Sequence, residues 1–265
     1  NRYLKFCFAH SIRCYISPKI SDIILMGSER IHLFDTPLLM SRNMGLAVDQ
    51  RVAKRIMDIL VSGIGIVITS PIMLLIAIAV KAYDRGPVFY FQDRLTIGGK
   101  PFKICKFRSM CVDSEKNGAR LASKHDSRIT PVGHVLRNLH LDELPQLFNV
   151  FKGDMSLVGP RPERKTIMQE YEKELPEFYY RLKVKAGLTG YAQVYGKYNT
   201  TPYDKLKLDL FYIENYSFLL DVKLIFMTVK IFFQKEVSEG VDDKQVNALK
   251  DSGRNTGASE DKTEE

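Results

Sequence analysis

A run of 22 residues without a charge, from Ile59 to Val80, constrains the fold of this chain more than any other feature. At 1.5 Å per residue, a straight helix of that length measures about 33 Å, enough to cross a hydrocarbon core of about 30 Å. Helices of soluble globular proteins seldom run this long without a polar face. The run therefore predicts a membrane-embedded segment, with a buried helix of a soluble core as the weaker alternative.

Two details of this segment favour a hairpin over a straight span. Ser70 and Pro71 lie in its middle, where proline removes a backbone hydrogen bond and favours a sharp bend. Basic residues such as Lys54 and Lys81 flank both ends, whereas a spanning helix keeps its basic flank mainly on the cytoplasmic side. We expect residues 51–82 to form a re-entrant helix-break-helix that turns at Ser70-Pro71 and leaves the membrane on the face it entered. A straight transmembrane helix is the serious alternative.

The charge of the chain is unevenly distributed. Its formal net charge is +8, but residues 236–265 hold nine acidic and four basic residues, so the first 235 residues carry 35 basic against 22 acidic residues. A region this basic usually binds phosphates, on nucleic acid, on nucleotides or at an anionic membrane surface. The acidic tail has almost no large apolar residues and is expected to be disordered. A mean hydropathy of −0.15 excludes a polytopic membrane protein.

Local patterning predicts mostly helices and one small β-hairpin. Residues 88–94 and 101–110 are aromatic, alternating runs on either side of a Gly98-Gly99 turn, which is typical of two paired strands. Apolar residues then recur at helical spacing between residues 132 and 158. Further helices are expected at 162–173, 201–216 and 219–233. The last of these is either an amphipathic helix on the bilayer surface or a packed core helix.

The densest set of chemically capable residues lies between residues 136 and 163. Proline is tolerated only in the first helical turn, so Pro145 places Asp142 and Glu143 at or just before the N-terminus of a helix. Free N–H groups and the helix dipole stabilise anions there. An ionised carboxylate so held can attack phosphorus or bind Mg²⁺, and two adjacent carboxylates can divide these tasks. Acidic residues are also common in the first turns of helices for stability alone. The residues around the pair therefore determine whether a functional role is indicated.

Basic residues surround this pair of carboxylates. Arg161 is fixed between Pro160 and Pro162, and such rigidity suits bidentate recognition of a phosphate. Arg137 precedes the pair on the chain. Three more basic residues are expected to share one face of the second strand: Lys103, Lys106 and Arg108. They could line a diphosphate site, with an ordinary solvated strand face as the alternative.

Five blocks of sequence follow one another between residues 51 and 235. They are KRIMDI (54–59), GPVFYFQDR (86–94), FKICKFRSM (102–110), LDELPQLFNVFKGDMSLVGPRPE (141–163) and AGLTGYAQVYGK (186–197). Together they resemble the bacterial sugar transferase family, the monotopic polyprenol-phosphate phosphoglycosyl transferases. Five collinear blocks are far more specific than any single motif. The last block departs from the family pattern, which commonly has Trp, Asn and Arg where this chain has Tyr191, Tyr195 and Lys197.

The resemblance implies a reaction and a set of residue roles. Such enzymes transfer a phosphosugar from a nucleotide diphosphosugar, usually a UDP-sugar, to undecaprenyl phosphate. They release UMP and form the first lipid-linked sugar of a surface polysaccharide or glycan. By this resemblance, Asp142 is the nucleophile that forms a covalent aspartyl-phosphosugar, and Glu143 helps to hold Mg²⁺. Arg161 is implied to bind phosphate and Gln193 to contact the nucleotide sugar.

The resemblance also implies an organisation of the chain. The expected fold class is α/β and membrane-associated: a mostly helical catalytic domain with a small β-hairpin, a re-entrant membrane helix-break-helix and amphipathic surface helices. Four regions are expected: a connector from an upstream region (1–50), the re-entrant hairpin (51–82), the cytosolic catalytic domain (83–235) and the acidic tail (236–265). The implied location is the inner membrane of a bacterium, with the catalytic domain on the cytosolic face.

The implied partners are the nucleotide-sugar donor, undecaprenyl phosphate and membrane lipid, and homo-oligomerisation stays open. Two other classes of function fit the sequence less well. A membrane-anchored scaffold or anionic-lipid-binding protein without catalysis would release no UMP from any UDP-sugar. A nucleic-acid-binding protein would explain the basic charge but not the apolar segment, so no nucleic-acid partner is expected.

Overall fold

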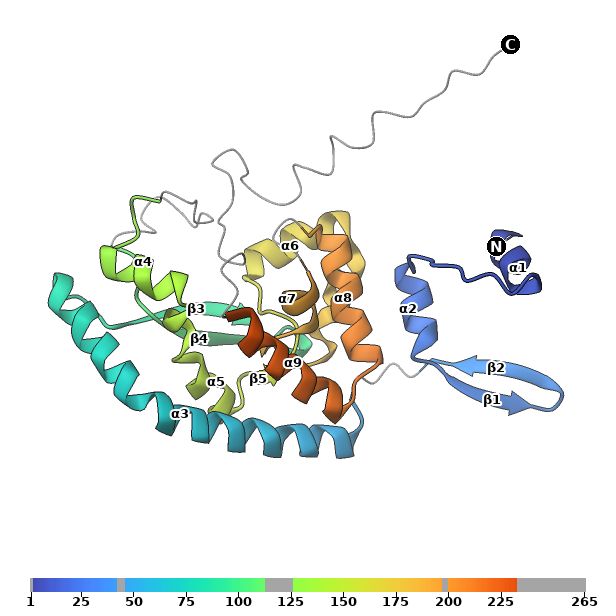
Figure 1. Cartoon of the computed structure of the whole chain (residues 1–265), viewed down its shortest axis with the longest axis horizontal. Helices are drawn as coiled ribbons and strands as arrows, with labels where there is room; N and C mark the ends of the chain where they lie inside the picture. Colours follow the sequence, from blue (N-terminus) through green and yellow to red (C-terminus); the bar gives the residue numbers. More distant parts are fainter. Residues whose placement is uncertain (1, 42–45, 113–125, 197–199, 233–265) are drawn as a thin grey trace, which may run out of the picture. The chain divides into compact units, whose positions relative to one another are not determined.

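The computed structural model describes residues 2–41, 46–112, 126–196 and 200–232. The chain forms two compact units, Asn1–Asn43 and Met44–Glu265, and each is described by itself (Figure 1). The acidic tail expected at 236–265 and the family departure at Lys197 lie outside the described residues.

The first unit contains two short helices and a β-hairpin. The helices are α1 (Arg2–Ala9) and α2 (Ile20–Met26), and β1 (Glu29–Leu33) pairs antiparallel with β2 (Thr36–Met40). The apolar pattern at residues 31–34 predicts one short strand, and Asp35-Thr36-Pro37 is typical of the turn that ends it. The structure has this strand, and a second strand begins at Thr36. Proline is nevertheless tolerated at this position, since both strands of a two-stranded sheet are edge strands.

The second unit begins with a single helix of 37 residues, α3 (Val48–Asp84). The expected break at Ser70-Pro71 is wrong: the helix continues through Pro71, and Figure 1 shows it curving along the rest of the unit. Proline has no N–H to donate to the carbonyl of Val67, four residues earlier. The Ser70 hydroxyl donates to that carbonyl oxygen instead, at 2.8 Å. The helix therefore bends without breaking.

The two faces of α3 have different surroundings. On the inner face, Met73, Ile76 and Val80 are buried in one cluster with Phe107 and Leu136. On the outer face apolar side chains stay exposed: Leu60, Ile64, Val67, Ile68, Leu74, Leu75 and Ile78. Within the described residues, α3 alone is long and apolar enough to cross a membrane, by length and composition.

The predicted β-hairpin that follows α3 is confirmed. Strands β3 (Phe89–Leu95) and β4 (Pro101–Phe107) pair antiparallel. Their connection contains a short 3-10 helix, η1 (Ile97–Gly99), where Gly98 and Gly99 have φ angles of 66° and 73°. Positive φ angles favour glycine, which explains the Gly-Gly pair that the turn prediction used.

The helical spacing between residues 132 and 158 does not form one helix. It is divided into α4 (Pro131–Asn138), the 3-10 turn η2 (Leu141–Glu143), α5 (Gln146–Lys152) and strand β5 (Ser156–Val158). His140, with a φ of 53°, ends the first helical segment, and Gly153, with a φ of 99°, ends the last. Pro145 precedes α5 directly, so the prediction that Asp142 and Glu143 lie just before a helix is confirmed.

A parallel strand pair joins the middle of the second unit. β5 pairs with β6 (Gly187–Thr189). A Cβ atom on Gly187 would overlap the backbone of Gly159. The two segments therefore approach more closely than any residue with a side chain would permit. This pairing places the Gly-Pro-Arg-Pro segment beside the start of the last sequence block.

The remaining elements of the second unit are helical: α6 (Lys165–Glu174), η3 (Pro176–Lys183), α7 (Tyr191–Tyr195), α8 (Pro202–Glu214) and α9 (Phe218–Phe232). The helices expected at 162–173 and 201–216 are confirmed with small shifts of their ends. The helix expected at 219–233 is confirmed as α9, which packs by one face, because Asp221 and Leu224 are buried while Leu219 and Phe226 are exposed. Its position on a bilayer surface stays a prediction.

Candidate active site

Asp142 and Glu143 lie in the short turn η2, between α4 and α5. The left-handed backbone of His140 turns the chain after α4, and Pro145 starts the next helix. Both carboxylates are half-buried. Two adjacent acidic side chains therefore stand in a turn whose limits are set by backbone geometry.

Glu143 is held by two cations from distant parts of the chain. Lys106 Nζ, on β4, donates to Glu143 Oε1 at 2.6 Å, and Arg161 Nη2 donates to the same oxygen at 2.9 Å. Burial alone would raise the pKa of Glu143, but Arg161 and Lys106 outweigh burial and lower this pKa far below the usual range of a glutamate. Glu143 is therefore ionised at neutral pH.

Asp142 differs from its neighbour. In the part of the chain that the structure describes, no hydrogen bond or ion pair engages its carboxylate. Burial raises the pKa of Asp142, Lys106 and Arg137 lower it, and the charge of Glu143 raises it. A carboxylate that is poorly solvated and has no fixed partner is well suited to act as a nucleophile.

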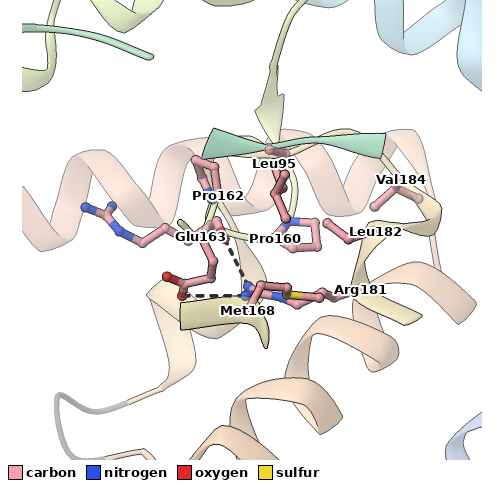
Figure 2. Close-up of a pocket in the computed structure, with 10 residues that line it drawn as sticks. Leu95, Pro160, Pro162, Glu163, Met168, Arg181, Leu182 and Val184 are labelled. Atoms are coloured by element: carbon pink, nitrogen blue, oxygen red, sulfur yellow. Dashed lines mark hydrogen bonds and ion pairs between the residues drawn. The ribbon is translucent and has the colours of Figure 1, made fainter. Parts of the chain in front are cut away.

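Arg161 projects from a loop whose backbone is firmly held. Gly187 N donates to Pro160 O and Leu95 N donates to Glu163 O, both at 3.0 Å. Figure 2 shows this loop, with Pro160 and Pro162, beside Leu95 at the end of β3. The loop is thus tied to one strand on each side, which limits where the Arg161 guanidinium can lie.

A small pocket adjoins Lys106 and Arg161. It is lined by seven residues: Arg94, Ile104, Lys106, Gln146, Arg161, Pro162 and Gly187. Three of these residues are cations and none is acidic. A site lined by charged donors and no carboxylate suits an oxyanion such as a phosphoryl group.

Two of the predicted site residues lie elsewhere. Side chains alternate along a strand, so Lys103 lies on the face of β4 opposite to Lys106 and is exposed; the expected shared face is wrong. Arg108 follows the end of β4 and forms an ion pair with Asp84, at the C-terminal end of α3. Of the three basic residues, only Lys106 reaches Glu143.

Arg137 and Gln193 have distinct positions. The Nε of Arg137, on α4, donates to Ser109 Oγ at 2.9 Å, and the charge of Arg137 lowers the pKa of Asp142. Gln193, on α7, donates to Leu188 O at 3.3 Å and does not line the pocket. The structure thus brings together Asp142, Glu143, Lys106 and Arg161, with Arg137 close enough to act on Asp142 by its charge.

Sequence reasoning misses several residues of this region. Arg94 and Gln146 line the pocket, and the only signal for them is that they fall within two of the five blocks. Arg181 lies between the fourth and fifth blocks and has no local signal, yet its side chain is only 2% exposed and bonds to the Arg161 loop.

The carboxylate pair fits a magnesium ion that takes its other ligands from substrate and water. Both cations bind Glu143 through Oε1, so among the described residues no ion pair reaches Oε2. Magnesium is usually held by one or two carboxylates together with substrate phosphates. No group of three or more His, Cys, Asp or Glu residues suited to a metal occurs in the described ranges, so these ranges offer no closed cage.

Known proteins similar to this chain point in the same direction. The model of the family described as bacterial sugar transferase matches residues 49–235. The chain is 47% identical, over 235 residues, to UDP-N-acetylgalactosamine-undecaprenyl-phosphate N-acetylgalactosaminephosphotransferase of Aeromonas hydrophila, which covers 86% of this chain and 54% of that protein.

Two further relatives carry the name UDP-glucose:undecaprenyl-phosphate glucose-1-phosphate transferase. The protein of Klebsiella pneumoniae is 44% identical over 208 residues, covering 77% of this chain and 43% of the relative. The protein of Caulobacter vibrioides is 36% identical over 229 residues, covering 82% of this chain and 84% of the relative. The chain spans about half the length of the first two of these three relatives. Because the family match covers residues 49–235, which include all but the first residue of α3 and every residue of the carboxylate site, the chain belongs to the bacterial sugar transferase family.

Proposed function

We propose that the protein transfers a phosphosugar from a UDP-sugar to undecaprenyl phosphate through a covalent intermediate on Asp142. The observation that carries this proposal is the asymmetry of the two adjacent carboxylates. Glu143 is bound by Lys106 and Arg161, whereas Asp142 beside it has no partner among the described residues. The names of the relatives, which include undecaprenyl phosphate and UDP-sugars, support the choice of substrates.

The reaction consists of two displacements at one phosphorus atom. First, a carboxylate oxygen of Asp142 attacks the phosphorus that carries the sugar, the bond to the bridging oxygen of the diphosphate breaks, and UMP leaves with that oxygen. Then a phosphate oxygen of undecaprenyl phosphate attacks the same phosphorus, and the bond to Asp142 breaks. Both nucleophiles are already anions, so no base has to remove a proton.

Positive charge is the main requirement of both displacements, because the phosphoryl group, the nucleophile and the leaving group are all anionic. Lys106 and Arg161 supply it at the pocket, and the Arg161 side chain is 44% exposed and so accessible to a ligand. Magnesium held by Glu143 and the diphosphate would add charge next to the leaving UMP. Since Glu143 is ionised at neutral pH, it can take this part while Asp142 reacts.

The attachment of α3 supports a re-entrant position, which we propose is at the cytosolic face of the inner membrane. Near the start of α3, Lys54 Nζ donates to Asp221 Oδ2 at 2.6 Å; near its end, Asp84 pairs with Arg108. A straight 37-residue helix is about 55 Å long, so a bilayer crossed by α3 would separate these two contacts. A bent helix that dips into one leaflet keeps both contacts on one side and the active site near the polyprenol phosphate headgroup.

UMP release by the full chain tests this function. The protein in nanodiscs is incubated with undecaprenyl phosphate, Mg²⁺ and either UDP-N-acetylgalactosamine or UDP-glucose, the two sugars that the relatives' names contain. We expect UMP from at least one donor and a loss of at least about 10³-fold in turnover for Asp142→Asn. Asp93→Asn, an exposed aspartate on β3, is the matched control and should turn over normally.

Two results would contradict the proposal. Near-normal turnover by Asp142→Asn would show that Asp142 is not the nucleophile. No UMP from any UDP-sugar, with a folded protein and both substrates present, would favour the scaffold without catalysis.

A further inference from the structure

A buried network of charged side chains holds the loop that carries Arg161. Its centre is Arg181, on η3, whose Nε and Nη2 lie 2.9 and 2.8 Å from Asp209 Oδ2 on α8. Arg181 and Asp209 are only 2% and 1% exposed. An arginine buried this deeply is stable only where acceptors surround it.

The network acts on three consecutive carbonyl groups of the loop. Arg181 Nη2 donates to the oxygen of Arg161 at 3.1 Å, and Arg94 Nη1 donates to the oxygen of Pro162 at 3.1 Å. The backbone N–H of Leu95 donates to the oxygen of Glu163 at 3.0 Å. Residues of β3 and η3 thus fix the backbone from which the Arg161 side chain reaches toward Glu143.

Glu163 is the common counter-ion of this network. Its Oε1 lies 2.5 Å from Lys205 Nζ and 3.5 Å from Arg181 Nη1, and its Oε2 lies 3.9 Å from Arg94 Nη1. Figure 2 shows the Glu163 carboxylate directed at Arg181. Burial alone would raise the pKa of Glu163, but Lys205 and Arg181 lower it to about 2. The carboxylate is therefore charged, and it compensates both arginines that hold the loop.

We propose that Arg181 and Glu163 are positioning residues for Arg161, which they place for binding the diphosphate of the donor. The proposal rests on the phosphate-binding role of Arg161 in the proposed function. Neither residue has to touch the substrate: Arg181 holds the Arg161 carbonyl, and Glu163 holds Arg181 and Arg94. Phosphate recognition by a guanidinium depends on the placement of its planar fork, so a small shift of the loop weakens binding.

A comparison of two backgrounds separates this role from a contribution to folding alone. The affinity for UDP with Mg²⁺ is measured by calorimetry on the full chain in nanodiscs. Arg181→Lys and Glu163→Gln are each made in the wild type and in Arg161→Ala. If both residues act through Arg161, each substitution should weaken UDP binding about tenfold in the wild type and less than about twofold in Arg161→Ala. Glu174→Gln, an exposed glutamate of α6, is the matched control and should leave the affinity unchanged.

The melting temperatures of the same variants complete the test. An equal loss of affinity in both backgrounds would overturn the proposal, because the residues would then affect UDP binding independently of Arg161. An unchanged affinity with a lowered melting temperature would also overturn it, because the network would then serve folding alone. Glu163→Gln keeps the size of the side chain, so it tests the proposal even if Arg181→Lys does not fold. UMP release by the wild type is measured as a separate test of the proposed function. A protein that binds UDP without turnover would contradict the proposed function. The affinity comparison would still decide whether Arg181 and Glu163 position Arg161.

Discussion

Asp142 and Glu143 are chemically similar side chains to which the surrounding residues give different properties. Glu143 shares one oxygen with Lys106 and Arg161, and this pairing lowers its pKa. Asp142 has no such partner in the described residues, and burial raises its pKa. Separated pKa values in a pair of carboxylates are typical of a division of roles. This difference is the basis of the proposal that Asp142 is the nucleophile and that Glu143 helps to hold magnesium.

The charge of Arg137 should affect the pH dependence of the reaction. Arg137 lowers the pKa of Asp142, so Arg137→Met should raise that pKa, because the ionised carboxylate loses a favourable neighbour. The acid limb of kcat/KM should then move to higher pH by about half a unit to one unit. The other titratable groups that act on Asp142, which are Lys106, Glu143 and His140, remain in this variant.

Initial rates of UMP release between about pH 4 and pH 8 measure this shift. Arg137→Lys keeps the charge and should restore most of the wild-type profile. An acid limb that stays in place, or moves to lower pH, would show that Asp142 is not the group that titrates.

Helix α3 packs on the rest of the second unit by its inner face, and an ion pair near each end adds to this packing. Lys54 and Asp221 form a buried ion pair that joins α3 to α9, and Tyr212 Oη donates to Asp221 Oδ1 at 2.7 Å. Asp84 and Arg108 join the other end of α3 to the end of β4. Between these two contacts the helix is continuous, because the Ser70 hydroxyl compensates for the N–H that Pro71 lacks.

The Lys54–Asp221 pair should show strong coupling in a double-mutant cycle. Lys54→Met leaves Asp221 buried without its cation, and Asp221→Leu leaves Lys54 buried without its anion. Each single change should cost about 3 kcal/mol or more, whereas the double variant should cost less than the sum, because it buries no unpaired charge.

Thermal unfolding of the full chain in nanodiscs measures this coupling. Lys223→Met, which removes an exposed lysine of α9, should change the melting temperature little. Additive losses for the two single variants would show that the two side chains do not stabilise each other.

Sequence reasoning succeeds where the information is local. The β-hairpin, the long apolar segment and the Pro145 boundary each depend on a few neighbouring residues, and the structure has all three. The shared face of Lys103 and Lys106 is wrong because their odd spacing puts them on opposite sides of a strand. The break at Pro71 is wrong because a single serine hydroxyl compensates for the missing N–H. Arg181 could not be predicted, since its partners are distant in sequence and meet only in the folded chain.

At the scale of the whole molecule, the attachment of both ends of α3 to the second unit predicts the membrane topology. Single cysteines replace Val48 and Tyr83, which are 73% and 52% exposed, in a chain whose four native cysteines are removed. A membrane-impermeant maleimide should label both positions in inverted membrane vesicles and neither in intact spheroplasts. Labelling of the two positions from opposite faces would mean that α3 spans the membrane.

Detection of the covalent intermediate is the most direct test of the proposed chemistry. The full chain is incubated with a UDP-sugar and Mg²⁺ but without undecaprenyl phosphate, and its intact mass is measured. We predict an added mass of one phosphosugar located on Asp142, an equal amount of released UMP, no adduct on Asp142→Asn, and loss of the adduct when undecaprenyl phosphate is added. An unmodified protein that releases UMP only when both substrates are present would contradict this, because it would show direct transfer without an enzyme-bound phosphosugar.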